Sequence, residues 1–183
     1  MLNNDLSQQI KRNFPYKPTE EQENAVKSFA EFLFSPSADS VFLMKGYAGT
    51  GKTTLISALV RTLDSLQRKV ILLAPTGRAA KVFSGYAGHP AYTIHKKIYR
   101  QKVFSNETDN FVANQNLHRN TLFIVDEASM IANEGLSGGH FGSGRLLDDL
   151  VQYVYNGLGC RLMLIGDTAQ LPPIGEEESP ALS

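Results

Sequence analysis

The chain has 183 residues, of which 42% are hydrophobic and 20% charged, and its formal net charge is zero; this is ordinary usage for one globular domain with a core of its own. No stretch approaches the roughly 18 consecutive apolar residues of a membrane span, and the first residues lack the apolar block of a secretory signal, so we expect a cytoplasmic protein with no membrane partner. The only cysteine, Cys160, excludes an intrachain disulfide and any cysteine-cluster metal site.

A polar leader, residues 1–18, precedes the first predicted helix. Thr19 opens this helix, because apolar residues then repeat at helical spacing: Val26, Phe29, Ala30 and Leu33. Four short apolar runs predict buried strands, at residues 41–44, 70–74, 122–125 and 162–165. Further helices are predicted over residues 53–67 and 145–154. Strands that alternate with helices indicate an α/β fold, a parallel β-sheet flanked by helices.

Two segments interrupt this alternation. Residues 102–104 and 111–113 predict a small β-hairpin around a polar tip at 105–110, as an insertion over about residues 100–118. Residues 137–144 are rich in glycine but follow no strand signal, so we interpret them as a mobile connection and not as a phosphate site.

Basic residues are concentrated in one part of the chain. Residues 69–120 contain eight Lys or Arg against two acids, whereas residues 121–183 contain two against nine. A phosphate backbone meets the local field and not the total charge, so the distribution favours a nucleic-acid partner. The alternative is an ordinary solvated surface.

Residues 46–54 read GYAGTGKTT and connect a predicted strand to a predicted helix. The stretch satisfies the phosphate-loop pattern, in which glycines let backbone N–H groups turn toward phosphate oxygens and the helix adds the positive end of its dipole. Lys52 is predicted to neutralise β- and γ-phosphate charge, and Thr53 to ligate Mg²⁺. The alternative is a flexible turn with an incidental lysine. The predicted ATP contacts are Gly46, Ala48, Gly49, Thr50, Gly51, Lys52, Thr53 and Thr54.

If this site hydrolyses ATP, another strand must end in acidic residues beside the loop, because Mg²⁺ must be held and a water molecule oriented. Asp126 and Glu127 follow the apolar run 122–125, where a parallel strand reaches the carboxyl edge of its sheet. We assign Asp126 to Mg²⁺ and Glu127 to activation of the water. Two acids that merely mark a strand end are the alternative.

Five motifs occur in the order and approximate spacing of the first RecA-like motor domain of superfamily-one DNA helicases, and the chain resembles that domain. Among these helicases it is most similar to the RecD and Dda group, which moves 5′ to 3′ on single-stranded DNA. The resemblance covers nearly the whole chain and implies a RecA-like P-loop NTPase fold, with the fourth predicted strand between the first and the third. The motifs are residues 46–54, 74–80, 92–95, 125–130 and 166–173.

The resemblance also implies roles for two glutamines. Gln22 matches the glutamine that reads adenine, although Thr19-x-x-Gln22 is equally a helix capping box. Gln170 matches the γ-phosphate sensor that couples hydrolysis to the DNA side, and would lie beside Glu127 and Lys52.

On the DNA side, the resemblance implies backbone contacts from the segment after the second predicted strand and from a neighbouring motif. The residues concerned are Thr76, Gly77, Arg78, Thr93 and His95. A lone histidine is often structural, which is the alternative for His95. The hairpin occupies the position of the family's strand-separating pin, but it is short and poor in aromatic residues.

Residues 19–183 are thus expected to form one RecA-like ATP-binding helicase domain. The family's second RecA-like domain, whose arginine completes the ATP site, is expected to be missing from this chain, which would reduce turnover by about 10³ to 10⁵. The implied activity is ATP-dependent 5′-to-3′ helicase action in DNA repair or recombination, with partners from those processes. The alternatives are a small-molecule kinase and a nucleotide-gated DNA-binding module without unwinding.

Overall fold

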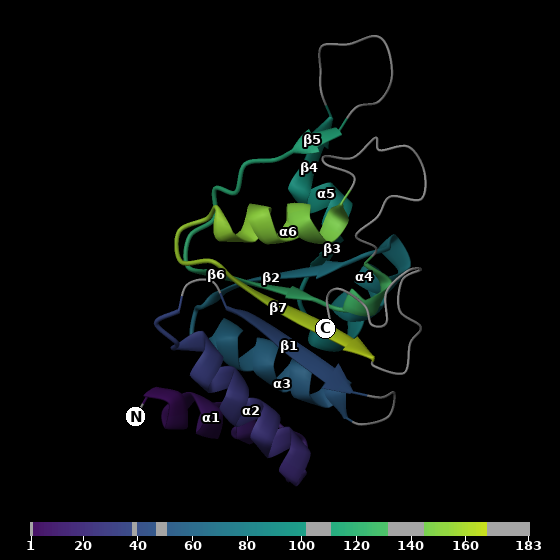
Figure 1. Cartoon of the computed structure of the whole chain (residues 1–183). Coiled ribbons are helices and arrows are strands. Elements are labelled where there is room, and N and C mark those ends of the chain that lie inside the picture. The colour runs from purple at the N-terminus through teal and green to yellow at the C-terminus, as the bar shows by residue number, and fades with distance from the viewer. Residues whose placement is uncertain (1, 38–39, 47–50, 102–110, 132–144, 168–183) are drawn as a thin grey trace.

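The computed structural model describes residues 2–37, 40–46, 51–101, 111–131 and 145–167 (Figure 1). Several predicted features lie outside these ranges: the hairpin tip, the glycine-rich stretch 137–144, the loop residues Ala48, Gly49 and Thr50, and Gln170. Within the described ranges, no helix is both long and apolar enough to cross a membrane.

A five-stranded sheet forms the centre of the fold, in the order β1-β7-β6-β2-β3, and all neighbouring strands are parallel (Figure 1). β7 lies between β1 and β6, as the family resemblance predicts. All four predicted strands are confirmed, and the edge strand β3 is additional. The strands are β1 (Val41–Gly46), β2 (Lys69–Ala74), β3 (Ala91–Thr93), β6 (Thr121–Val125) and β7 (Arg161–Asp167).

Alternation of side chains along the strands builds two apolar layers, one on each face of the sheet. All five residues of β6 are buried. Leu122 and Ile124 join one apolar cluster, whereas Phe123 and Val125 join the other. Successive side chains of a strand point to opposite faces, so only a continuous apolar run suits a strand that is covered on both sides.

Helices cover both faces. Helices α1 (Leu2–Arg12), α2 (Glu20–Leu33), α3 (Lys52–Ser65) and α4 (Gly77–Ala87) contribute buried residues to the first cluster. The second cluster receives buried residues from α5 (Ile94–Ile98), α6 (Leu146–Tyr155) and the short 3-10 helix η1 (Ala128–Met130). Figure 1 shows α1, α2 and α3 on one side of the sheet and α5 and α6 on the other.

The structure adds elements that the sequence did not predict. The polar leader contains α1, whose Leu6 and Ile10 are buried with Phe14 in the first cluster. The stretch has few apolar residues, so its composition did not indicate a helix that packs on the core. The first hairpin strand is β4 (Tyr99–Gln101), three residues earlier than predicted, and it pairs antiparallel with β5 (Phe111–Ala113).

Candidate functional site

The glycine-rich loop leaves β1 at Gly46 and enters α3 at Lys52, at the carboxyl edge of the sheet. Gly51 caps α3 with φ +82°, a left-handed conformation in which a side chain is strained. A Cβ at this position would also overlap with the Gln22 Nε2 atom. The left-handed backbone therefore favours glycine here, and a side chain would also displace the Gln22 amide.

Lys52 reaches across this edge to a neighbouring strand. Its Nζ lies 3.5 Å from the Gly166 carbonyl oxygen on β7, the strand between β1 and β6. Thr53 and Thr54 follow in the first turn of α3, and Thr53 is exposed. The first helical turn thus presents an ammonium group, a hydroxyl and the positive end of the helix dipole at one edge of the sheet.

Asp126 lies directly beyond the end of β6, so its carboxylate belongs to the same edge as the loop. Its backbone N–H donates to the Leu73 carbonyl at 3.0 Å, which continues the pairing of β6 with β2 for one more residue. Its Oδ1 accepts a 2.8 Å hydrogen bond from the Glu127 N–H. The Asp126 carboxylate is therefore held in place by backbone that is itself anchored to the sheet.

Glu127 has a left-handed backbone, with φ 55°, just before η1 begins. For a residue with a Cβ this conformation costs about 1–2 kcal/mol. Such strain persists where the surrounding structure imposes it, and it is concentrated at functional sites. The turn sends the chain away from the sheet immediately after the two carboxylates.

Tyr86 on α4 is a residue of this site that sequence reasoning missed. Its hydroxyl donates to Asp126 Oδ2 at 2.6 Å. Burial, and then the neighbouring Asp126 carboxylate, raise the pKa of Tyr86 far above the usual tyrosine range, so the phenol stays protonated. Tyr86 follows Phe83 by three positions, which is a signal for a shared helix face, but nothing in the sequence pairs it with Asp126.

Gln22 joins the start of α2 to the phosphate loop. Its Oε1 accepts from the Thr19 N–H at 2.9 Å, which completes the capping box, and its Nε2 donates to the Gly51 carbonyl at 3.2 Å. Hydrogen bonds that the Tyr16 oxygen accepts from the Thr54 and Gln22 side chains lower the pKa of Tyr16. The capping box that is the alternative role of Gln22 is therefore present, and the Gln22 side-chain amide also contacts Gly51 at the end of the phosphate loop.

The predicted DNA contacts follow β2 and β3, which are neighbours in the sheet with Ala74 paired to Thr93. Thr76 caps α4 and accepts from the Ala79 N–H at 3.1 Å, and Arg78 is exposed in the first turn of the helix. Thr93 caps α5 in the same way. Both motifs therefore belong to the carboxyl edge.

His95 and Tyr92 extend this surface. His95 is half-buried beside Tyr99, and burial lowers its pKa, so the imidazole is neutral at pH 7. Tyr92 is 42% exposed, with the ammonium groups of Lys96 and Lys97 at 6.0 and 5.9 Å from its ring centre. An exposed aromatic ring beside two cations is a surface suited to an anionic, base-bearing strand.

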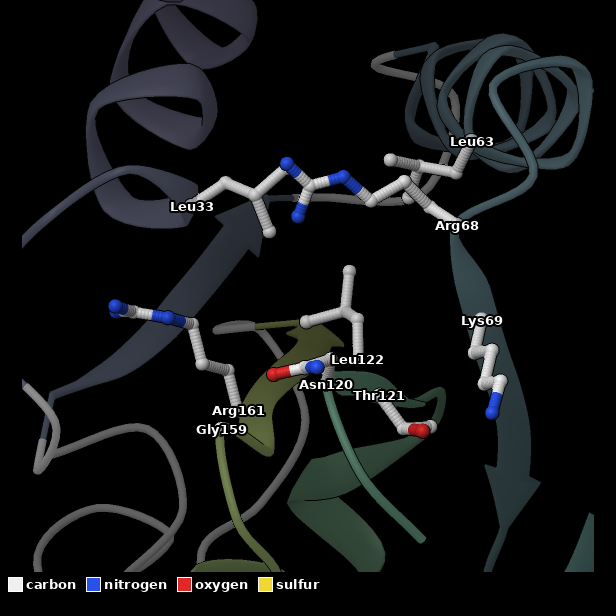
Figure 2. Close-up of a pocket in the computed structure, with 9 residues that line it drawn as sticks. All are labelled: Leu33, Leu63, Arg68, Lys69, Asn120, Thr121, Leu122, Gly159 and Arg161. Atoms are coloured by element: carbon white, nitrogen blue, oxygen red, sulfur yellow. The ribbon is translucent and has the colours of Figure 1, made fainter.

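A cavity of about 260 Å³ lies at the opposite, amino edge of the sheet (Figure 2). The first residues of three strands line it: Lys69, Thr121 and Arg161. The Arg161 guanidinium donates to the carbonyls of Phe32, in the last turn of α2, and of Ser35 and Ser37, just beyond that helix. This cation ties the end of α2 to the sheet, and the cavity is remote from the loop and from Asp126.

The carboxyl-edge groups suit a magnesium ion that is shared with phosphates. Within the described residues, no group of three or more His, Cys, Asp or Glu side chains is gathered as for a metal held by protein alone. Mg²⁺ is usually bound by one or two carboxylates together with phosphate oxygens and water. Each Asp126 oxygen accepts one hydrogen bond in the described residues and keeps a further lone pair for such a ligand.

A parallel sheet, a glycine-rich loop between β1 and α3, and an acidic end of β6 define a P-loop nucleotide-binding domain. Residues 17–180 match the family model described as an AAA domain. The chain belongs to this family, as a RecA-like motor domain of the superfamily-one RecD and Pif1 helicase type.

Known proteins of this type are similar over most of the chain. The ATP-dependent RecD2 DNA helicase of Deinococcus radiodurans is 31% identical over 79% of this chain and 18% of its own length. The ATP-dependent DNA helicase Pif1 of Bdellovibrio bacteriovorus is 30% identical over 75% of this chain and 30% of its own. The chain spans about a third or less of the length of the curated relatives it matches.

The fold is also similar to a solved structure. The crystal structure of Pif1 helicase from Candida albicans aligns with a TM-score of 0.50 and 21% identity. The alignment covers 91% of this chain and 37% of the other. This likeness supports the RecA-like arrangement of the sheet and its helices.

Proposed function

We propose that this chain is the ATP-binding motor domain of an ATP-dependent DNA helicase, which acts on single-stranded DNA and moves 5′ to 3′ in DNA repair or recombination. The observation that carries the proposal is the arrangement of the carboxyl edge. Lys52 contacts β7, the strand next to β6, and Asp126 and Glu127 follow directly after β6. Cationic and acidic groups on adjacent elements of this edge suit a metal-bound polyphosphate.

Each residue has a defined task in this proposal. Lys52 and the N–H groups of the loop hold the β- and γ-phosphates, and Thr53 and Asp126 would hold Mg²⁺, which neutralises phosphate charge when bound. Glu127 orients the attacking water and accepts its proton. Gln22 contacts adenine with its remaining donor and acceptor capacity, and Gln170 senses the γ-phosphate.

The DNA strand would run over the neighbouring part of the same edge. Thr76, Gly77 and Arg78 would contact the backbone at the start of α4, and Thr93 and His95 at the start of α5. The local excess of basic residues between 69 and 120 supports this placement. Stepping along DNA requires a second RecA-like domain, which we propose as a partner of this one.

Nucleotide binding and turnover test the assignments. Lys52→Ala should abolish binding of a fluorescent ATP analogue, because the phosphate charge then lacks its cation, whereas Lys27→Ala on the exposed face of α2 should bind as the parent chain does. Glu127→Gln should keep ATP binding and lose hydrolysis. Unchanged binding in Lys52→Ala, or unchanged turnover in Glu127→Gln, would remove that residue from its role.

The effect of DNA distinguishes the helicase from other P-loop proteins. ATP hydrolysis by a helicase motor should rise when single-stranded DNA is added. A small-molecule kinase should be indifferent to DNA, and a binding module should bind both ligands without turnover. Hydrolysis that DNA does not stimulate, measured with the second RecA-like domain present, would therefore contradict the proposal.

A further inference from the structure

Tyr86 holds one oxygen of the carboxylate that the proposed function assigns to magnesium. The Tyr86 hydroxyl lies 2.6 Å from Asp126 Oδ2, and the Glu127 N–H lies 2.8 Å from Oδ1. Two donors on opposite oxygens fix the plane of the carboxylate. A carboxylate with a fixed plane presents its remaining lone pairs in a defined direction, and groups that orient a metal ligand in this way tune the affinity for the metal.

The tyrosine ring is itself fixed. Phe83, one helical turn earlier on α4, is fully buried and stacks on the Tyr86 ring, with the ring centres 5.3 Å apart and the planes at 28°. The Tyr86 hydroxyl is therefore carried by a ring that packing against Phe83 holds in place. A mobile donor would lose more conformational entropy on binding Asp126, so this packing strengthens the contact.

Helix α4 links this contact to the DNA side of the domain. Its first turn carries Thr76, Gly77 and Arg78, and Tyr86 is the last residue but one of the same helix. A helix of 11 residues is about 16 Å long, so a single short element carries both the Tyr86 hydroxyl and the predicted DNA contacts of its first turn.

We propose that Tyr86 is a positioning residue, which orients Asp126 for magnesium–ATP. This inference rests on the proposed function, because it requires that Asp126 serves Mg²⁺. Tyr86 touches neither ATP nor the metal in the proposal and acts only through the aspartate.

The protein offers a matched control for the test. The Tyr99 hydroxyl also donates to an aspartate oxygen at 2.6 Å, that of Asp149 on α6. This second pair is buried against the second apolar cluster, away from the loop and Asp126. Tyr86→Phe and Tyr99→Phe each remove one oxygen and one tyrosine–aspartate hydrogen bond, so general loosening of the fold should affect both variants.

The experiment titrates Mg²⁺ into the chain at a fixed concentration of a fluorescent ATP analogue and follows its anisotropy. Tyr86→Phe should need about tenfold more Mg²⁺ for half-maximal binding, since loss of a group that supports a metal ligand commonly costs 10- to 100-fold in metal affinity. Its binding of the analogue in EDTA should match that of the parent. Tyr99→Phe should unfold at a lower temperature yet keep the parent's Mg²⁺ requirement.

The outcomes distinguish failure of the positioning role of Tyr86 from failure of the proposed function. A Tyr86→Phe variant with an unchanged or lower Mg²⁺ requirement overturns the positioning role and leaves the nucleotide site intact. An equal shift in Tyr99→Phe overturns it as well, because the effect is then general. If the parent chain itself binds no ATP analogue with or without Mg²⁺, the proposed function fails, and the inference fails with it.

Discussion

The carboxyl and amino edges of the sheet both carry charged side chains, but these are held in different ways. At the amino edge, Arg161 donates to three backbone carbonyls and its Cζ lies 5.5 Å from the centre of the Phe32 ring. At the carboxyl edge, each Asp126 oxygen accepts one hydrogen bond from the part of the chain that the structure describes and keeps capacity for another ligand. Charge alone therefore does not mark a site: the Arg161 guanidinium binds carbonyls of its own chain, whereas the Asp126 oxygens keep lone pairs that can ligate a metal ion.

Substitution of Arg161 should give the largest change in stability, with no change in nucleotide binding. Arg161→Ala removes charge-assisted hydrogen bonds to the carbonyls of Phe32, Ser35 and Ser37, so we expect a loss of about 2–4 kcal/mol in the free energy of unfolding. Urea denaturation measures the loss, and ATP-analogue binding of the folded variant should match the parent.

Arg68 provides the matched control for this prediction. It lines the same cavity (Figure 2), and its guanidinium lies 5.4 Å from the centre of the Phe34 ring. Such an exposed contact contributes about 0.5–1 kcal/mol, so Arg68→Ala should lose much less than Arg161→Ala. Equal losses would show that the carbonyl contacts of Arg161 contribute little.

A pair of glycines sharpens the comparison at the carboxyl edge. Gly51→Ala forces a side chain into a left-handed conformation and against Gln22, so we expect a loss of about 1–3 kcal/mol and weaker ATP binding. Gly85→Ala on the exposed side of α4 meets no atom within 4 Å and should gain about 0.5–1 kcal/mol, because alanine is the better helix former. A Gly51→Ala variant as stable as the parent would contradict the predicted strain.

The smallest expected effect concerns two histidines, one from each edge. Burial lowers the pKa of His95 and of His118, and the charges of Lys97 and Lys69 lower that of His118 further. Both groups have a lower pKa in the folded than in the unfolded state. Their contribution to stability is therefore present above about pH 6.5 and is lost as the pH falls from there through the folded pKa.

Added salt should change the pKa of His118 but not that of His95, as measured by an NMR titration. About 0.5 M NaCl screens the lysine charges, so the pKa of His118 should rise, while that of His95, which burial lowers, should stay constant. Equal responses of the two rings would contradict the electrostatic cause for His118.

Much of the fold could be predicted because its signals are local in the chain. The apolar run of β6 and the capping residue of α2 are each decided by a few adjacent residues. Helix α1 was missed because Leu6 and Ile10 are its buried apolar residues in an otherwise polar stretch, and their burial depends on α2 and α3. The middle position of β7 could be predicted only through the family resemblance, since pairing between distant strands leaves no local pattern.

The candidate site, too, could be predicted from the sequence only in part. Lys52 at the start of α3, and the acids that follow β6, could be assigned to the carboxyl edge from the sequence, because parallel strands end there together. Only the tertiary structure decided what holds them: Tyr86 on Asp126, Gln22 against Gly51, and Lys52 at the Gly166 carbonyl. These contacts join residues 29 to 114 positions apart, and the packing of α2, α3 and α4 in the fold brings them within hydrogen-bonding distance.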